Sequence, residues 1–139
     1  MKSIVNVCRV LFFVIISLPF IIYGQTAQVS GSGADRILGE WITQKKDSKV
    51  KIVKDQDGSY SGKLVWVASP NESFTGETIL KDVKYDPATD TYECPWVYDP
   101  KLDMAARATA HVSNDTLYLK ARKGVITKNE FFTRPVVRP

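Results

Sequence analysis

The sequence predicts an all-β domain, in its simplest form an antiparallel up-and-down barrel of about eight strands. After residue 36, short segments alternate apolar and polar residues, with the two-residue period of strands that bury one face. Turn-forming residues separate these segments, and no long segment has helical periodicity. Closing the sheet removes its exposed edges, which favours a barrel over a small open sandwich. Periodicity alone does not exclude the sandwich.

The expected strands follow from this alternation. They cover Leu38–Gln44, Val50–Lys54, Tyr60–Ala68, Thr78–Tyr85, Tyr92–Tyr98, Ala105–Ser113, Thr116–Arg122 and Glu130–Arg134. Hairpin turns are indicated by Asp-Gly within "DQDGS" (55–59) and by "SND" (113–115). Asp-Pro pairs at 86–87 and 99–100 also suit turns, because proline fixes φ and cannot donate within a strand.

The first 24 residues have the parts of a secretory signal peptide. Lys2 and Arg9 precede or border the apolar run "VLFFVIISLPFII" (10–22), and small or polar residues follow it. The run is shorter than the roughly 20 residues of a membrane span and contains Pro19, so an uncleaved anchor is the weaker alternative. We expect cleavage near Gly24 or Ala27 and export to the periplasm or the medium. Residues 25–35 form the predicted linker, and residues 36–139 form the barrel domain, without a membrane span.

Net charge and cysteine content limit the kinds of partner and of covalent bond that we expect for this protein. The formal charge is +4, and loss of Lys2 and Arg9 with the signal leaves +2. The densest lysine stretch, residues 45–55, alternates with valine and isoleucine, which favours a solvated strand face over a nucleic-acid groove. Cys94 would be the only thiol of the mature chain, so no intrachain disulfide is expected. A buried filler is the preferred reading of Cys94, and a reactive thiol or a dimer bridge is the alternative.

The two ends of the domain carry residues suited to closing a barrel. In "GEWITQ" (39–44), Gly39, Trp41 and Thr43 share one face. In a closed barrel the first and last strands are neighbours, so Arg134 of "EFFTRP" (130–135) can stack on the Trp41 ring. Such a contact contributes about 0.5–2 kcal/mol. We therefore expect Gly39, Trp41 and Arg134 to close the barrel.

The Gly-x-Trp opening and the final Arg resemble the signature of lipocalin-like (calycin) barrels. A closer resemblance rests on the order of "GEWIT", "VKIVK", "GSYSGKLVWV", "GETIL", "VYDP", "NDTLYLKARKG" and "FFTRP", and is to the bacterial secreted family DUF2147. The matching positions are Gly39, Trp41, Thr43, Tyr60, Gly62, Lys63, Val65, Asp99, Pro100, Phe132 and Arg134. Asp103 and Met104 depart from the Gly and Lys usual in that family. The resemblance implies a lipocalin-like barrel and export, and assigns no activity.

Residues for catalysis or metal binding are scarce. His111 is the only histidine, and with one mature cysteine it cannot build a usual zinc site, so we expect no metal and no cofactor. The pairs Asp99/Asp103 and Asp86/Asp90 suit turns better than calcium ligation. Gly-rich phosphate loops and a Ser-His-Asp order are absent from the sequence. A hydrolase would depend on Asp99, Asp103 and His111, and the interpretation leans away from an enzyme.

The aromatic and aliphatic strand faces carry the functional hypothesis. We expect a small lipophilic or amphipathic ligand to contact inward-facing side chains, namely Tyr60, Leu64, Trp66, Tyr92, Trp96, Leu117, Leu119 and Phe132. Ala106, Ala108 and Ala110 would leave room beside them. The alternative is that these side chains fill the barrel, as eight strands permit, and that the protein is an interaction or structural module acting through its outer surface. The sequence does not name the ligand or the oligomeric state.

Overall fold

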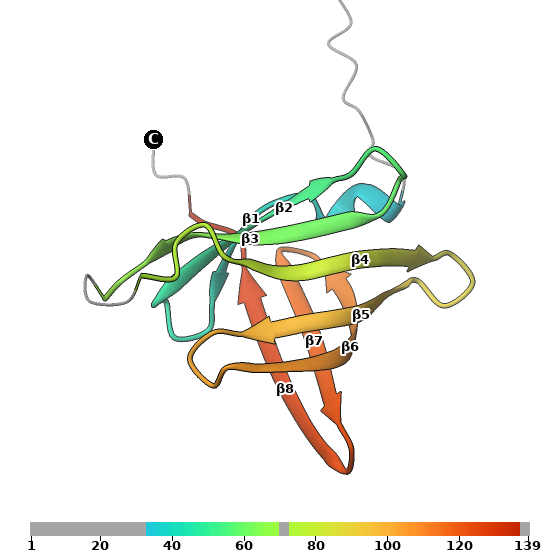
Figure 1. Cartoon of the computed structure of the whole chain (residues 1–139). Coiled ribbons are helices and arrows are strands. Elements are labelled where there is room, and N and C mark those ends of the chain that lie inside the picture. Colours follow the sequence, from blue (N-terminus) through green and yellow to red (C-terminus); the bar gives the residue numbers. More distant parts are fainter. Residues whose placement is uncertain (1–32, 70–72, 137–139) are drawn as a thin grey trace, which may run out of the picture.

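The chain folds into one closed antiparallel barrel of eight strands in sequence order (Figure 1). The structure is a computed structural model that describes residues 33–69 and 73–136. A short 3-10 helix, η1 (Gly33–Ile37), precedes the strands. The strands are β1 (Gly39–Thr43), β2 (Ser48–Lys54), β3 (Tyr60–Val67), β4 (Thr78–Asp86), β5 (Thr91–Asp99), β6 (Met104–Ser113), β7 (Thr116–Lys123) and β8 (Ile126–Thr133). The predicted fold class is therefore confirmed.

The observed strand ends lie within two residues of those expected from the sequence, except at the start of β8. β8 begins at Ile126, four residues before the expected Glu130, because its first half pairs with β7 without being buried. Gly33 to Asp35, expected in the linker, form the first part of η1. The predicted signal peptide and most of the predicted linker lie outside the described residues. No helix among the described residues is long and apolar enough to cross a membrane.

η1 covers one end of the barrel, which we call the closed end. The Tyr92 hydroxyl donates to the carbonyls of Gly33 and Ala34, each at 3.0 Å. The Tyr60 hydroxyl donates to Asp35 at 2.7 Å, and Lys54 pairs with the same carboxylate at 2.9 Å. These contacts hold η1 over the two tyrosines, whose rings meet edge to face with centroids 6.1 Å apart. The interior below η1 is therefore filled by side chains.

The Trp41–Arg134 closure forms as predicted. β1 pairs with β8 at two positions only, Ile42 with Thr133 and Thr43 with Phe132. Beside this short ladder the Arg134 guanidinium carbon lies 3.7 Å from the Trp41 ring centroid, and the Trp41 side chain is 0% exposed. Arg134 Nη1 donates to the Leu38 carbonyl at 2.6 Å. The side chain thus supplements a closure that the backbone ladder makes only in part.

Gly39 is required by the same closure. Its φ is +103°, and a Cβ at this position would lie 2.8 Å from Arg134 Nη1. An L side chain rarely adopts that backbone conformation, and here it would also meet the guanidinium. The Gly-x-Trp pair therefore supplies the space for the cation and the ring on which it stacks.

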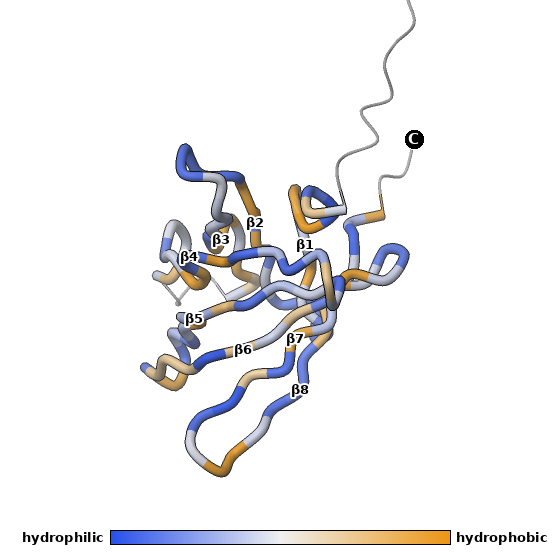
Figure 2. Tube along the Cα trace, turned by 90° about the vertical axis from the view of Figure 1, so that its right-hand side faces the viewer, coloured by the Kyte–Doolittle hydropathy of each residue, from blue (hydrophilic) through white to orange (hydrophobic). Residues whose placement is uncertain are grey.

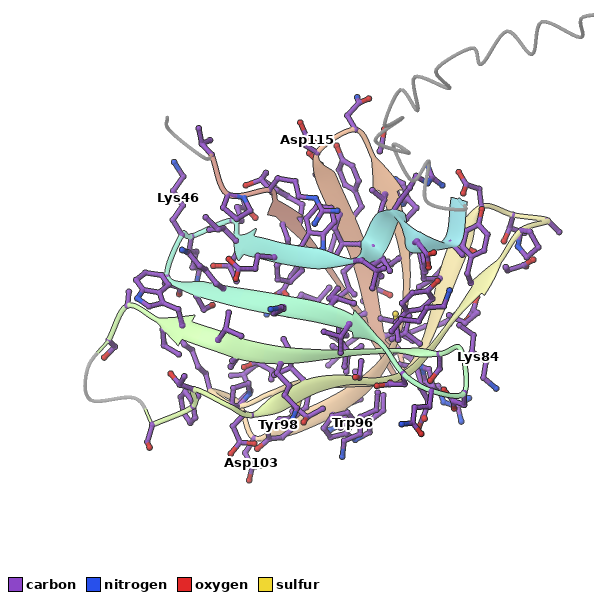
Figure 3. All side chains as sticks on the ribbon, turned by 90° about the horizontal axis from the view of Figure 1, so that it is seen from above. Lys46, Lys84, Trp96, Tyr98, Asp103 and Asp115 are labelled. Carbon is purple, nitrogen blue, oxygen red and sulfur yellow. The ribbon has the colours of Figure 1, made fainter. Side chains whose placement is uncertain are left out.

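The predicted inward orientation of Trp66 and Trp96 is wrong. Val50 pairs with Leu64 but Lys49 pairs with Trp66, so a β-bulge at Val65 turns Trp66 outward, where it is 42% exposed. In β5, Cys94 pairs with Ala108 and Val97 with Ala106. The extra residue between Cys94 and Val97 breaks the alternation, and Val97 takes the inward position expected of Trp96. Figure 3 shows Trp96 beside Tyr98. The two rings stack with their centroids 5.5 Å apart.

Candidate functional site

A cavity of about 230 Å³ occupies the half of the barrel remote from η1. Its floor is apolar and comes from β1, β2, β3, β4 and β7, with the side chains of Trp41, Val50, Ile52, Leu64, Leu80, Leu117 and Leu119. Val97, Phe74, Ile79 and Phe132 extend this lining. All the floor residues are buried. A largely apolar, concave site of this kind suits a small lipophilic molecule better than a polar one.

The floor forms because inward and outward side chains alternate without interruption at the lining residues of β2 and β7. Val50 and Ile52 share one face of β2 and point inward, while Lys51 between them is exposed. Leu117 and Leu119 do the same on β7, opposite the exposed Tyr118. Such two-residue spacing places aliphatic side chains side by side across the barrel interior.

Half of the predicted ligand contacts line this cavity. They are Leu64, Leu117, Leu119 and Phe132. Tyr60 and Tyr92 are buried, but they fill the closed end below η1 rather than the cavity. Trp66 and Trp96 lie outside the lining, as the two bulges require. Val50, Ile52 and Leu80 were not predicted, although the alternation in "VKIVK" could have identified the first two.

The alanine face of β6 points inward, but it does not line the cavity. Ala108 and Ala110 are buried and Ala106 is half-buried. Ala108 pairs with Cys94 and Ala110 with Tyr92, and these larger side chains lie beside them on the same face. None of the three alanines lines the cavity. The room expected beside Ala108 and Ala110 is therefore taken up by Cys94 and Tyr92, and Val97 lies opposite Ala106.

Polar side chains surround one side of the cavity, which we call the mouth. Asp47, between β1 and β2, accepts a hydrogen bond from the Thr43 hydroxyl at 2.7 Å and from the Ser48 hydroxyl at 3.2 Å. Lys101, between β5 and β6, pairs with Asp47 at 3.2 Å. The Thr43 bond is the largest cause that lowers the Asp47 pKa, and Lys101 acts in the same direction. Asp47 is therefore ionised at neutral pH and joins two loops across the mouth.

A second group of charges lies on β8. Lys128 contacts Glu130 at 2.6 Å and Asp99, at the end of β5, at 3.7 Å. The Glu130 hydrogen bond is the main cause that raises the Lys128 pKa, while partial burial lowers it. Lys45, Lys101 and Lys128 are thus matched at the mouth by Asp47, Asp99 and Glu130, all of which line the cavity. The mouth offers both donors and acceptors to the polar end of a ligand.

Cys94 is buried, as the preferred reading of the sequence expected. It is a free thiol with 1% exposure. Burial is the first cause that raises its pKa to about 12, and Glu93 adds to the shift. A thiol of this pKa is almost entirely protonated at neutral pH, which disfavours nucleophilic or redox chemistry.

The candidate hydrolytic residues do not meet. His111 is exposed near the end of β6 and stacks on Tyr118 with ring centroids 4.7 Å apart. Asp99 and Asp103 lie at the opposite end of that strand, where Asp99 accepts from the Lys101 backbone N–H and Asp103 from the Tyr98 hydroxyl. Among residues 33–69 and 73–136, no group of three metal-ligating side chains comes together. The two aspartates serve the turn in which they lie.

The comparison with protein families identifies the domain. Residues 39–134 match the family model described as "Uncharacterized protein conserved in bacteria (DUF2147)". The chain therefore belongs to the DUF2147 family. The match begins at Gly39 and ends at Arg134, so both sides of the Trp41–Arg134 closure fall within the DUF2147 domain. Comparisons with curated proteins and with solved structures found no match.

Proposed function

We propose that the protein is exported to the bacterial cell envelope, as a periplasmic or secreted domain, and binds a small lipophilic or amphipathic molecule in the cavity. The observation that carries the ligand proposal is the apolar floor of the cavity beside a mouth with both signs of charge. Export is supported by the signal-like composition of residues 1–24. The proposal does not require catalysis.

The cavity volume limits the size of the ligand. At about 30 Å³ for a water-sized group, 230 Å³ holds about eight such groups. This is below the usual range for drug-sized ligands, about 300–1,000 Å³. A short acyl chain or a small cyclic lipid fits this limit, with its polar end at Asp47, Lys101 or Lys128.

Native mass spectrometry of the protein purified from a bacterial host tests the proposal. We expect a stoichiometric apolar adduct, or its capture from a lipid extract. The rival function, an interaction or structural module, is supported by the filled closed end, where Tyr60 and Tyr92 leave no cavity. Absence of any adduct across lipid extracts favours that rival.

A matched pair of substitutions separates the cavity from the outer surface. Leu64 lines the cavity, whereas the neighbouring Val65 points outward on the same strand. Leu64→Trp fills the cavity, and we expect adduct formation to be lost. Val65→Trp adds a comparable ring to the exterior and leaves the adduct in place. Thermal melts of both variants verify folding, and an adduct that survives Leu64→Trp contradicts the assigned site.

A further inference from the structure

The tip of the β7–β8 hairpin, Lys123 to Ile126, presents aliphatic side chains to solvent. Val125 is 98% exposed and Ile126 is 68% exposed. Figure 2 shows this tip as a hydrophobic turn between hydrophilic stretches of β7 and β8. Single exposed aliphatic residues are ordinary, but two adjacent ones at the end of a projecting hairpin suit contact with an apolar phase.

The tip projects because half of β8 has one neighbour. β8 pairs with β7 along its whole length, from Ile126 opposite Lys123 to Thr133 opposite Thr116. It pairs with β1 only at Phe132 and Thr133. The hairpin therefore extends past the point where the barrel closes, and Figure 1 shows it reaching away from the other strands. Its aliphatic tip can reach a flat surface without obstruction by the barrel.

Cationic side chains lie directly behind the tip. Arg107 on β6 pairs with Arg122 on β7, and Lys123 follows. Like charges placed directly opposite each other destabilise a sheet. Within the described part of the chain, no acidic side chain lies within ion-pair distance of these three cations. Among residues 33–69 and 73–136, the cluster therefore has no counterion that would explain why Arg107 lies opposite Arg122.

A shallow hollow joins these cations to an aromatic side chain. It is lined by Pro95, Trp96, Ala105, Ala106, Arg107, Arg122, Lys123 and Gly124, none of which is acidic. Trp96 reaches this position because of the bulge in β5. An indole beside cations and behind an aliphatic tip has the amphipathic character of residues found at the level of lipid headgroups.

We propose that the β7–β8 tip docks the protein on the surface of an anionic lipid bilayer. Val125 and Ile126 enter the boundary between headgroups and acyl chains, and Arg107, Arg122 and Lys123 contact lipid phosphates. The order along the hairpin, aliphatic at the tip and cationic behind it, matches the order of hydrocarbon and phosphate in a bilayer. We favour the bilayer over a protein partner because the aliphatic residues project beyond the barrel and the cations lie behind them, which is the order a layered lipid surface requires. This docking surface does not depend on the ligand proposed for the cavity.

Vesicle flotation tests the proposal with purified protein. We expect flotation with vesicles of equal parts phosphatidylcholine and phosphatidylglycerol, and weak flotation with phosphatidylcholine alone. Added salt reduces the binding, because the cations are exposed and screened. Failure to float with the anionic vesicles overturns the proposal.

Two sets of substitutions locate the contact. Val125→Ser with Ile126→Ser should lower the partition coefficient about tenfold or more, as expected for loss of aliphatic burial. Arg107→Gln, Arg122→Gln and Lys123→Gln together should lower it on the order of a hundredfold at low salt. All five side chains are exposed, so the melting temperature should change little.

A charge-matched control tests whether binding to anionic vesicles depends only on the net charge of the protein. Lys51→Gln, Lys63→Gln and Lys84→Gln remove the same charge from exposed positions on other strands. We expect this control to bind anionic vesicles nearly as well as the unmodified protein. An equal loss in the control, or full binding by the Val125/Ile126 variant, contradicts docking by the tip. Equally tight binding to polyglutamate that is insensitive to Val125 and Ile126 indicates an acidic protein partner and also overturns it.

Discussion

Arg134→Lys tests whether the side chains of the first and last strands hold the barrel closed. The Arg134 guanidinium stacks on Trp41 at 3.7 Å and donates to three carbonyls, those of Leu38, Glu40 and Arg36, at 2.6, 3.4 and 2.8 Å. Burial lowers the Arg134 pKa, so part of the group is out of water and the contacts replace lost hydration. A lysine keeps the charge but has no planar fork.

The expected loss follows from these contacts. A lysine ammonium can keep one carbonyl contact and loses at least one charged hydrogen bond, which contributes about 1.5 kcal/mol at the low end of the usual range. The low end applies because Arg134 is only partly buried. Loss of stacking adds about 0.5–1 kcal/mol. We therefore expect the free energy of unfolding to fall by about 2–2.5 kcal/mol.

Urea unfolding followed by tryptophan fluorescence measures this loss. With a slope of about 1–3 kcal/mol per molar urea, the midpoint should fall by about 0.7–2.5 M. Arg122→Lys is the matched control, because Arg122 is exposed and has no ion pair among the described residues. A midpoint for Arg134→Lys equal to that of the control refutes the reasoning. It would mean that the short β1–β8 ladder alone closes the barrel.

Further predictions concern the closure, the buried thiol and the mouth. Trp41→Ala should lower the free energy of unfolding by about 3–5 kcal/mol in the same assay, because a fully buried indole and its 2.8 Å hydrogen bond to the Ile37 carbonyl are lost; a midpoint near that of the unmodified protein contradicts this. Gly39→Ala should lower the free energy of unfolding by about 1–3 kcal/mol, and by more than Gly76→Ala does. Both glycines have positive φ, but only at Gly39 would a Cβ meet another side chain, that of Arg134. Equal losses in the two variants would show that the contact with Arg134 does not matter. Iodoacetamide at neutral pH should modify Cys94 only as the protein unfolds, because the thiol is buried and burial raises its pKa to about 12. Peptide mass spectrometry follows the modification, and rapid modification of the native protein contradicts the prediction. Asp47→Asn should destabilise the protein at neutral pH, and this loss of stability should shrink as the pH falls. The pKa of Asp47 is lowered in the folded state, so its carboxylate stabilises the fold above the unfolded pKa of about 3.9, and this contribution disappears below the folded pKa. Urea midpoints at several pH values measure the difference, and a difference that does not depend on pH excludes the charge as its cause.

The fold class and the closure were predictable because they follow from patterns that no local irregularity disturbs. The two-residue alternation and the turn residues define the strands. Closure of the barrel makes the first and last strands neighbours, whatever the register of the other strand pairs. Gly39, Trp41 and Arg134 therefore met as expected, and the DUF2147 match spans these residues. The short extent of the β1–β8 ladder was not predictable, because it depends on where the chain turns after Thr43.

The orientation of Trp66 and Trp96 was not predictable from alternation, because one inserted residue reverses every side chain beyond it. In β5 a signal was present, since Pro95 cannot donate to a ladder and proline within a strand often marks a bulge. In β3 the run "LVWV" is apolar throughout, so it does not show which of its residues point inward. The first half of β8 was not predicted either, because its residues are all exposed and therefore show no alternation of apolar and polar side chains.

The two functional alternatives that the sequence left open apply to different halves of one barrel. The closed end is filled by Tyr60 and Tyr92 under η1, as the structural module requires, whereas the other half contains a cavity, as the ligand hypothesis requires. Trp41 takes part in both, because it supports Arg134 and lines the cavity floor. A substitution at Trp41 therefore cannot distinguish loss of folding from loss of binding. Leu64 lines the cavity from β3, which takes no part in the β1–β8 ladder, so Leu64→Trp is the change chosen to remove the proposed binding while the barrel stays closed.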